Sequence, residues 1–411
     1  MKKLMMMAMM LVASATAFAG DSDALKAILK AKDYAEAQSL INSSLAQLAS
    51  DAEKAKAYNK LVDLACEKFN KEENTKITNA AMQKNEPVDV EGMVAAGKVA
   101  LQAAMDCDKY DQMPNEKGKV APKFREKNVA RTQSMRLSLL QETEKLVNDK
   151  KRKEALEIFD LYISTAKSPF FAGVKSVEED PNMGYAAFYG GQSALLLEDF
   201  AKAKELFKVG VRDTSKQISE YSLDGMLQAM RNNVKSAADS AKYINELTEL
   251  NKEFADKEKI FAFLSEAYMA TGENAKVMAL ADERLAQYPG STLPYVYKGI
   301  IYQNDRKFDE AIAEYNKVKE ENSPVFLNCI YNKAVCKWNK AAAWNEEKTD
   351  VRTGRMKPAD EATFKELMNS AQADFEKAKE LDPDQQTVKW KYLLHNIYTQ
   401  TGQTDKAAAL E

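Results

Sequence analysis

The stretch TLPYVYKGIIYQNDRKFDEAIAEYNKVKEENSP, residues 292–324, decides the fold. It consists of two segments with helical periodicity, joined by a short polar turn. In the first segment Tyr295, Gly299 and Tyr302 recur at steps of three and four residues, which places them on one face of a helix. Gly299 is expected where two helix axes approach closely, with the tyrosines filling the space around it.

The second segment repeats the pattern. Ala311, Tyr315 and Val318 have the same helical spacing. Pro324 is expected to end this helix, because proline has no amide hydrogen and its ring collides with the preceding turn. The stretch therefore predicts a pair of antiparallel helices that pack through small residues.

This order of residues (aromatic, small, aromatic, then Ala, aromatic, Pro) resembles the tetratricopeptide repeat, whose period is 34 residues. Clear copies begin at residues 184, 258, 292 and 327, and the step from Phe261 to Tyr295 equals the period. The resemblance covers residues 135–411 well and residues 20–130 weakly. It implies an all-α fold, a right-handed superhelical solenoid in which each antiparallel helix pair buries its apolar face against its neighbours.

The repeat pattern also predicts how the chain is divided. Residues 20–170 form an N-terminal helical region with degenerate repeats, and residues 171–411 form the repeat array. An insertion at about 339–363 separates the two helices of one repeat, and its residues 349–358 (TDVRTGRMKP) read as a loop. Insertions in solenoids map to one face, often the binding face. The two arginines of this loop suggest a second surface that contacts a partner. The alternative is that the loop is only solvated.

The first 19 residues indicate export. Lys2 and Lys3 precede an apolar run at residues 4–17, and Ala-Phe-Ala ends at Ala19. These are the parts of a signal peptide, and the apolar run is shorter than the roughly 20 residues that cross a bilayer. We expect cleavage after Ala19 and a periplasmic or secreted chain. No later segment is apolar for long enough to form a transmembrane helix.

Composition narrows the function further. The 59 basic and 62 acidic residues nearly balance, which gives no basic footprint for nucleic acid. With only 15 Gly and 10 Pro, and with many Ala, Lys, Glu and Leu, the chain is expected to be helical almost throughout.

Four cysteines are present in a chain that is expected to reach an oxidising compartment, where disulfides are permitted but not required. Cys329 and Cys336 lie about 10 Å apart along one predicted helix, beyond the ~7 Å that a disulfide spans. Cys66 and Cys107 could meet across an antiparallel helix pair. The alternative is that they are buried free thiols acting as small hydrophobic side chains.

Catalytic patterns are not visible in the sequence. The only histidine is His395, and one histidine does not build a His-based metal site or a triad without other partners. Zincin, phosphate-loop and nucleophile-elbow motifs do not occur. We therefore expect a protein that is not an enzyme and has no cofactor or metal.

The resemblance implies that ligands contact first-helix residues facing the inner groove. Carried over position by position, the groove residues are Tyr185, Phe188, Gln192, Gln303, Asn304, Asn328, Tyr331, Trp338, Asn339, Tyr392 and Asn396. Aromatic rings offer broad contact area and amides pair with a peptide backbone or with sugar hydroxyls. Packing between neighbouring repeats is an equal alternative for these aromatics.

Two functions are compatible with such a groove. The first is an exported scaffold that binds a protein or peptide partner, with cell-envelope assembly as the role that the resemblance implies. The second is a carbohydrate- or nutrient-binding component at the cell surface, in which Trp338 and Tyr392 stack on sugar rings. Neither the partner nor the oligomeric state follows from the sequence.

Overall fold

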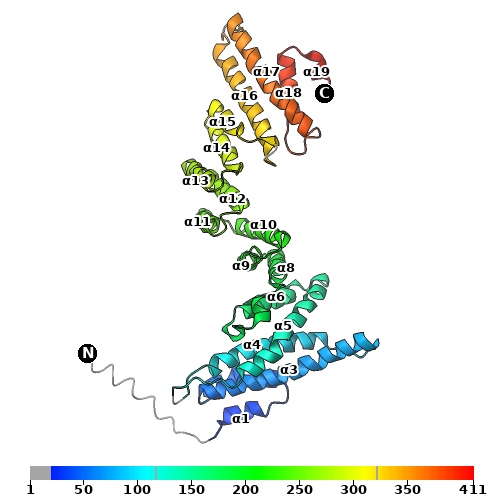
Figure 1. Cartoon of the computed structure of the whole chain (residues 1–411). Coiled ribbons are helices and arrows are strands. Elements are labelled where there is room, and N and C mark those ends of the chain that lie inside the picture. Colours follow the sequence, from blue (N-terminus) through cyan, green and yellow to red (C-terminus); the bar gives the residue numbers. More distant parts are fainter. Residues whose placement is uncertain (1–19, 116–117, 321–322) are drawn as a thin grey trace, which may run out of the picture. The chain divides into compact units, whose positions relative to one another are not determined.

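Helices are the only regular secondary structure in the part of the chain that the computed structural model describes, which is residues 20–115, 118–320 and 323–411 (Figure 1). Helices that are neighbours in the chain pack against one another as pairs. The all-α fold class predicted from the sequence is therefore confirmed.

The chain divides into two compact units, one up to Asn233 and one from Val234, and each is described by itself. The predicted boundary near residue 170 separates degenerate from clear repeats, which is a different criterion, and it stays a prediction. The predicted signal peptide, residues 1–19, lies outside the described residues. Among the helices that are described, none combines the length and the apolar character needed to cross a membrane.

The first unit begins with two short helices, which three long ones follow. Ser22 and Ser50 cap two of them by accepting a hydrogen bond from an amide of the first turn. The helix that begins at Asp51 runs on to Met82, because no helix-breaking residue occurs before Pro87. The helices are α1 (Asp23–Leu29), α2 (Tyr34–Ser44), α3 (Asp51–Met82), α4 (Val90–Asp111) and α5 (Arg125–Asn148).

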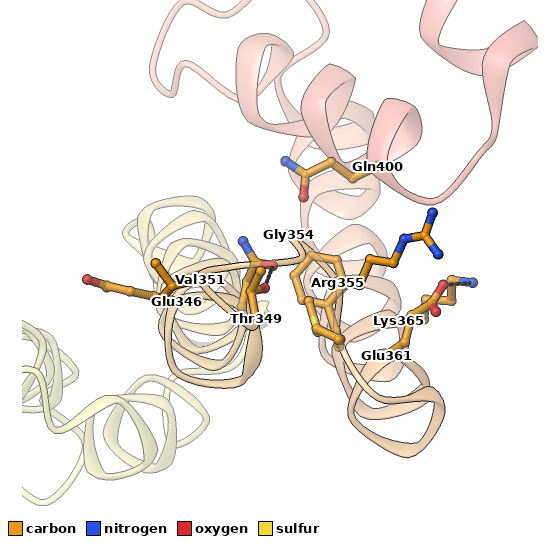
Figure 2. Close-up of a pocket in the computed structure, with 11 residues that line it drawn as sticks. Glu346, Thr349, Val351, Gly354, Arg355, Glu361, Lys365 and Gln400 are labelled. Atoms are coloured by element: carbon orange, nitrogen blue, oxygen red, sulfur yellow. Dashed lines mark hydrogen bonds and ion pairs between the residues drawn. The ribbon is translucent and has the colours of Figure 1, made fainter.

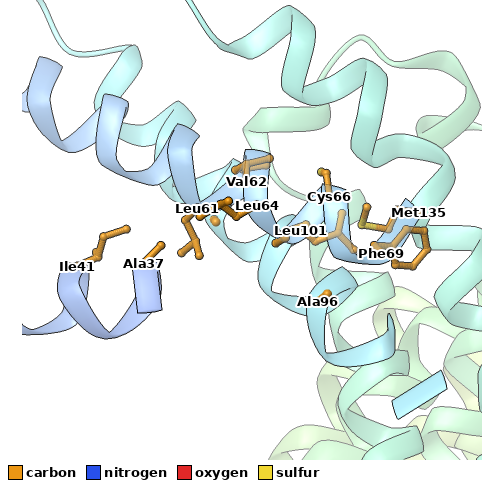
Figure 3. Close-up of a cluster of buried hydrophobic side chains, with 14 of the residues drawn as sticks. Ala37, Ile41, Leu61, Val62, Leu64, Cys66, Phe69, Ala96, Leu101 and Met135 are labelled. Carbon is orange, nitrogen blue, oxygen red and sulfur yellow. The ribbon is translucent and has the colours of Figure 1, made fainter. Parts of the chain in front are cut away.

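One apolar cluster holds these helices together (Figure 3). Its side chains come from one face of each helix and are almost completely buried, which is the pattern of an amphipathic helix bundle. Members that Figure 3 labels are Ala37, Ile41, Leu61, Val62, Leu64, Cys66, Phe69, Ala96, Leu101 and Met135.

The remainder of the first unit is built from shorter helices. Three of them, α8, α9 and α10, contact each other pairwise, and α8 also contacts α6. The helices are α6 (Arg152–Ala166), α7 (Lys175–Glu178), α8 (Met183–Leu196), α9 (Phe200–Gly210) and α10 (Lys216–Asn232), with a 3₁₀ turn at Pro169–Phe171. The helix pair predicted from residue 184 onward is therefore present as α8 and α9.

The second unit continues the same pairing. Its helices are α11 (Ala237–Glu253), α12 (Glu258–Ala270), α13 (Asn274–Gln287), α14 (Leu293–Asn304), α15 (Phe308–Tyr315), α16 (Phe326–Lys348), α17 (Pro358–Leu381), α18 (Lys391–Gln400) and α19 (Thr404–Ala408). Along most of this unit each helix contacts the next one in the chain. The predicted pairs starting at residues 258 and 292 are present as α12–α13 and α14–α15.

The end of α15 differs from the prediction. The helix stops at Tyr315, so Pro324 does not end it. After Tyr315 the backbone tightens, because the amides of Lys317 and Val318 donate to carbonyls three residues earlier instead of four. Val318 is still buried, with 2% of its surface exposed, although it lies outside the helix.

The region of the predicted insertion contains the end of one long helix and the start of the next. Helix α16 runs on to Lys348, and a nine-residue connection leads to α17, which begins at Pro358. Proline fits this first helical position because its missing amide hydrogen has no partner there in any helix.

All four cysteines are free and buried. Cys107 lies on α4, and its thiol donates to the carbonyl of Ala55 on α3 at 3.3 Å. Cys66 and Cys107 are therefore not bridged, and the interpretation as small hydrophobic side chains is confirmed.

Candidate functional site

Helix α8 carries small residues on its buried face. A Cβ atom at Gly190 would lie 2.8 Å from the Cβ of Phe159 on α6, and one at Gly191 would lie 2.7 Å from the ring of Phe207 on α9. No side chain fits at either position without displacing a neighbour. The glycines therefore let α8 lie directly against α6 and α9.

The ring of Phe207 also fixes the next helix. A Cβ atom at Gly225 of α10 would lie 2.4 Å from this ring, so Phe207 is held between Gly191 and Gly225. Phe207 is fully buried. Both helices pack against the Phe207 ring, so the contact between α8 and α10 has a defined register. The solvent-facing sides of the two helices therefore lie next to each other.

Four aromatic side chains gather on these solvent-facing sides. On α8 the rings of Tyr185 and Tyr189 have centroids 4.5 Å apart, and Phe188 lies 5.0 Å from Tyr189. Tyr221 of α10 completes the group, with its ring 6.0 Å from that of Phe188. We call these four residues the aromatic patch.

The aromatic patch is open to solvent. Tyr185 and Tyr189 each expose 38% of their surface and Tyr221 exposes 51%, whereas Phe188 is half-buried beneath them. Partial burial, and to a lesser extent Tyr189 and the Glu144 carboxylate, raise the pKa of Tyr185. Its hydroxyl is therefore neutral at physiological pH and available as a hydrogen-bond donor.

A buried ion pair fixes the segment that leads into α8. The guanidinium of Arg136 on α5 lies 3.3 Å from the carboxylate of Asp180, and it donates to Thr165 Oγ1 and to the carbonyl of Tyr162, both at 2.9 Å. The Tyr162 hydroxyl donates to the same carboxylate at 2.5 Å. Because Asp180 precedes α8 by three residues, this network determines where the helix begins.

The structure brings the predicted groove residues Tyr185 and Phe188 together in the aromatic patch. Gln192, the third predicted residue of α8, is exposed one turn further along the helix. Two members were missed. Tyr189 follows Tyr185 by one helical turn, and Tyr221 lies 33 residues after Phe188, close to the repeat period. Both signals were present, but Tyr221 lies between the clear copies that begin at residues 184 and 258.

The other predicted groove residues belong to the second unit, and three of them are engaged in packing. The ring of Tyr331 lies 5.9 Å from that of Phe375, edge to face. Trp338 packs against the apolar core of α16 to α18. Gln303 accepts a hydrogen bond from the Tyr315 hydroxyl at 2.9 Å.

The remaining predicted residues of this unit face solvent to different degrees. Tyr392 exposes 73% of its surface, and Asn304 is exposed. The other three are half-buried, namely Asn328, Asn339 and Asn396. They lie on α14, α16 and α18, and among the described contacts no hydrogen bond joins any two of them.

Within the described part of the chain, no three His, Cys, Asp or Glu side chains lie close enough together to hold a metal ion. His395 on α18 is about one-third exposed and lies 4.0 Å from a carboxylate oxygen of Glu411.

Comparison of the chain with models of known protein families and with curated proteins finds no match. The functional argument therefore depends on the geometry of the surfaces described above. Of these, the aromatic patch is the one that combines exposed rings, fixed helices and two independently predicted residues.

Proposed function

We propose that the chain is an exported, non-enzymatic scaffold of the tetratricopeptide-repeat type that binds a protein or peptide partner. In this proposal the helix pairs stack as a right-handed superhelical solenoid, and first helices such as α8 and α10 line its inner groove. The observation that carries the proposal is the aromatic patch, in which Tyr185, Tyr189 and Tyr221 remain exposed above a half-buried Phe188.

The chemistry of the aromatic patch suits a polypeptide. Tyrosine provides a large contact area with little conformational entropy to lose, and it is enriched among the residues that dominate binding energy. Close contacts at glycines fix the helices beneath the patch. Binding therefore costs little backbone conformational entropy. The exposed amide of Gln192 can satisfy a peptide group beside the rings.

The ring geometry favours a polypeptide over a sugar. Tyr185 and Tyr189 are inclined to each other by 48°, and Phe188 and Tyr189 by 71°. Such rings form a corrugated surface that receives separate side chains, whereas stacking on a pyranose needs one ring that is accessible on its flat face. Of the two residues expected to stack on a sugar, Trp338 packs against the core, and only Tyr392 is exposed.

Export is the second part of the proposal. Residues 1–19 have the composition of a signal peptide, and the described chain begins at once with residues anchored to the fold. Ser22 donates to the Glu53 carboxylate through both its amide and its hydroxyl at 2.7 Å. Cleavage after Ala19 would leave these contacts in place, and cell-envelope assembly remains the proposed role.

A peptide-library selection tests the binding function. Residues 20–411 are used to select random dodecapeptides, and the affinities of the selected peptides are measured by fluorescence anisotropy. The double variant Tyr185→Ala/Tyr221→Ala is expected to bind at least about tenfold more weakly, as for tyrosines that act as binding hot spots. Ile77→Ala, which removes an exposed apolar side chain elsewhere in the same unit, is the matched control.

Two results would overturn the proposal. One is that none of the selected peptides loses affinity in the double variant. The other is a glycan array in which sugars bind to the chain and binding is lost on Tyr185→Ala, because that outcome would assign the patch to carbohydrate recognition.

A further inference from the structure

The loop of the insertion is folded as a fixed turn. The Asp350 carboxylate accepts from the amides of Arg352 at 3.0 Å and Thr353 at 2.7 Å. The backbone of Asp350 also pairs with Arg355 and Gly354, at 3.0 and 2.8 Å, and Gly354 has the positive φ of 66° that such a turn requires. These bonds hold the loop in one conformation.

The helices that flank the loop are tied to each other. The indole N–H of Trp344, near the end of α16, donates to the carbonyl of Asp360 in the first turn of α17 at 2.9 Å. The Thr349 hydroxyl donates to Asn345 at 3.1 Å. The base of the loop is therefore anchored on both sides.

Between loop and helices lies an open depression of about 920 Å³ (Figure 2). Its apolar lining is formed by Val351, Met356 and Phe364, and Val351 is fully exposed. Covering a fully exposed valine at the tip of a rigid turn is favourable in free energy, because it removes apolar surface from water.

The charges that line the depression are arranged on two sides. Glu361 and Lys365 form an ion pair with each other at 3.0 Å. The Arg355 guanidinium has no carboxylate partner among the described residues, and in Figure 2 it extends to the side where Lys365 lies. Glu346 lies on the opposite side of the loop in the same view.

We propose that this depression binds a segment of a polypeptide partner that carries a carboxylate next to an apolar side chain. The carboxylate pairs with Arg355, whose planar guanidinium can donate two parallel hydrogen bonds to it. The Gln400 side chain also lines the depression, and the apolar side chain of the partner covers Val351 and Phe364. The site is separate from the aromatic patch and does not depend on it.

The balance of charge selects a single carboxylate over a polyanion. The depression contains two cations, Arg355 and Lys365, and two anions, Glu346 and Glu361. A nucleic acid or another polyanion would meet both glutamates, and repulsion of like charges would oppose its binding. One carboxylate engages the unpaired guanidinium and avoids this cost.

The test uses residues 20–411 and a random dodecapeptide library, with the Arg355→Gln variant as counter-selection. Peptides that bind the wild type but not this variant are synthesised, together with forms in which each Asp or Glu is replaced by its amide. We expect these peptides to carry an acidic residue beside an apolar one. Affinity should fall at least about tenfold on Arg355→Gln and equally on amidation of that residue.

Further variants separate this proposal from general charge effects. Arg352→Gln removes a cation from the same loop that does not line the depression, and it should leave the affinity unchanged. Val351→Ser should weaken binding, whereas Tyr185→Ala/Tyr221→Ala should not. Circular dichroism confirms that each variant is folded.

Three outcomes would overturn the proposal. The counter-selection could yield no peptides, the selected peptides could be neutral, or Arg352→Gln could weaken binding as much as Arg355→Gln. If no selected peptide depends on Tyr185 and Tyr221 while acidic peptides still bind through Arg355, the proposed function is rejected and this inference stands.

Discussion

Gly299 of α14 lies so close to Tyr315 of α15 that a Cβ atom at residue 299 would come within 2.4 Å of the tyrosine ring. Tyr315 exposes only 2% of its surface, and its hydroxyl donates to Gln303 back on α14. The ring therefore has no free space into which to move. Gly299 is needed for the close approach of two helices, although glycine is a poor helix former.

Gly299→Ala should destabilise the second unit. The gain in helix propensity is about 1 kcal/mol, but the added methyl group must displace the buried Tyr315 ring, and overpacking costs about 1–3 kcal/mol. We expect a net loss and a lower unfolding midpoint. All three tryptophans lie after residue 337, so tryptophan fluorescence during denaturation reports on this unit.

Gly290→Ala is the control for that experiment. A Cβ atom at Gly290 would have no heavy atom within 4 Å, so the substitution should be neutral or slightly stabilising. Equal stability of the Gly299→Ala and Gly290→Ala variants would contradict the close packing of α14 on α15.

Much of the fold could be predicted from the sequence because helical periodicity and small residues are local signals. Gly299 was expected at a close contact between helices, and it lies against a buried aromatic ring. The end of α15 could not be predicted in the same way. Proline excludes a helix where it stands, but nothing local shows that Asn316 already begins a tighter turn.

The sequence predicted only part of the candidate site, because exposure of a side chain depends on neighbouring helices. Repeat positions show which helix face an aromatic occupies, but they do not show whether a neighbouring helix covers it. Tyr331 and Tyr392 hold equivalent predicted positions, yet Tyr331 packs on Phe375 whereas Tyr392 exposes 73% of its surface. That difference depends on tertiary contacts, which a single sequence does not display.

Removal of one partner from the buried pair Arg136–Asp180 should destabilise the first unit strongly. Both side chains are almost completely buried, and burial lowers the pKa of Arg136, although Tyr162 and Asp180 oppose this change. Arg136→Met should cost about 3–5 kcal/mol, because it leaves the Asp180 carboxylate buried without its cation. Far-ultraviolet circular dichroism during thermal unfolding measures the loss.

A double-mutant cycle checks that interpretation. Arg136→Met combined with Asp180→Asn should be less destabilising than the sum of the two single variants, because the second change removes the charge that the first one strands. The exposed pair Lys175–Glu179 is the comparison, and Lys175→Ala should cost well under about 1 kcal/mol. Additive effects at Arg136 and Asp180 would show that the pair is not coupled.

The N-terminal contact predicts a dependence of stability on pH. Burial by itself would raise the pKa of Glu53, but hydrogen bonds from Ser22 and from the Ala49 amide lower it overall. A carboxyl group whose pKa is lower in the folded state stabilises the fold at neutral pH. This stabilisation disappears as the pH falls from the unfolded-state pKa through the folded-state value.

Glu53→Gln should therefore be less stable than the wild type at pH 7, and the difference should shrink as the solution is acidified towards pH 3. Hydrogen exchange of amides in α1 and at the start of α3 follows this region directly. Glu67→Gln, at an exposed position of α3, controls for the loss of one carboxylate. A difference that grows on acidification would contradict the assigned contact.

The four thiols should be inert in the folded chain. Burial is the main cause that raises the pKa of Cys107, Cys329 and Cys336 to about 12, and it also raises the pKa of Cys66. At pH 8 a thiol with such a pKa is ionised in roughly one molecule in ten thousand, and the thiolate is the reactive form. Iodoacetamide should label none of the four within minutes, and all four in denaturant without reductant. Two labelled thiols after denaturation would instead reveal a Cys66–Cys107 disulfide and would require α3 and α4 to pack differently around Ala55.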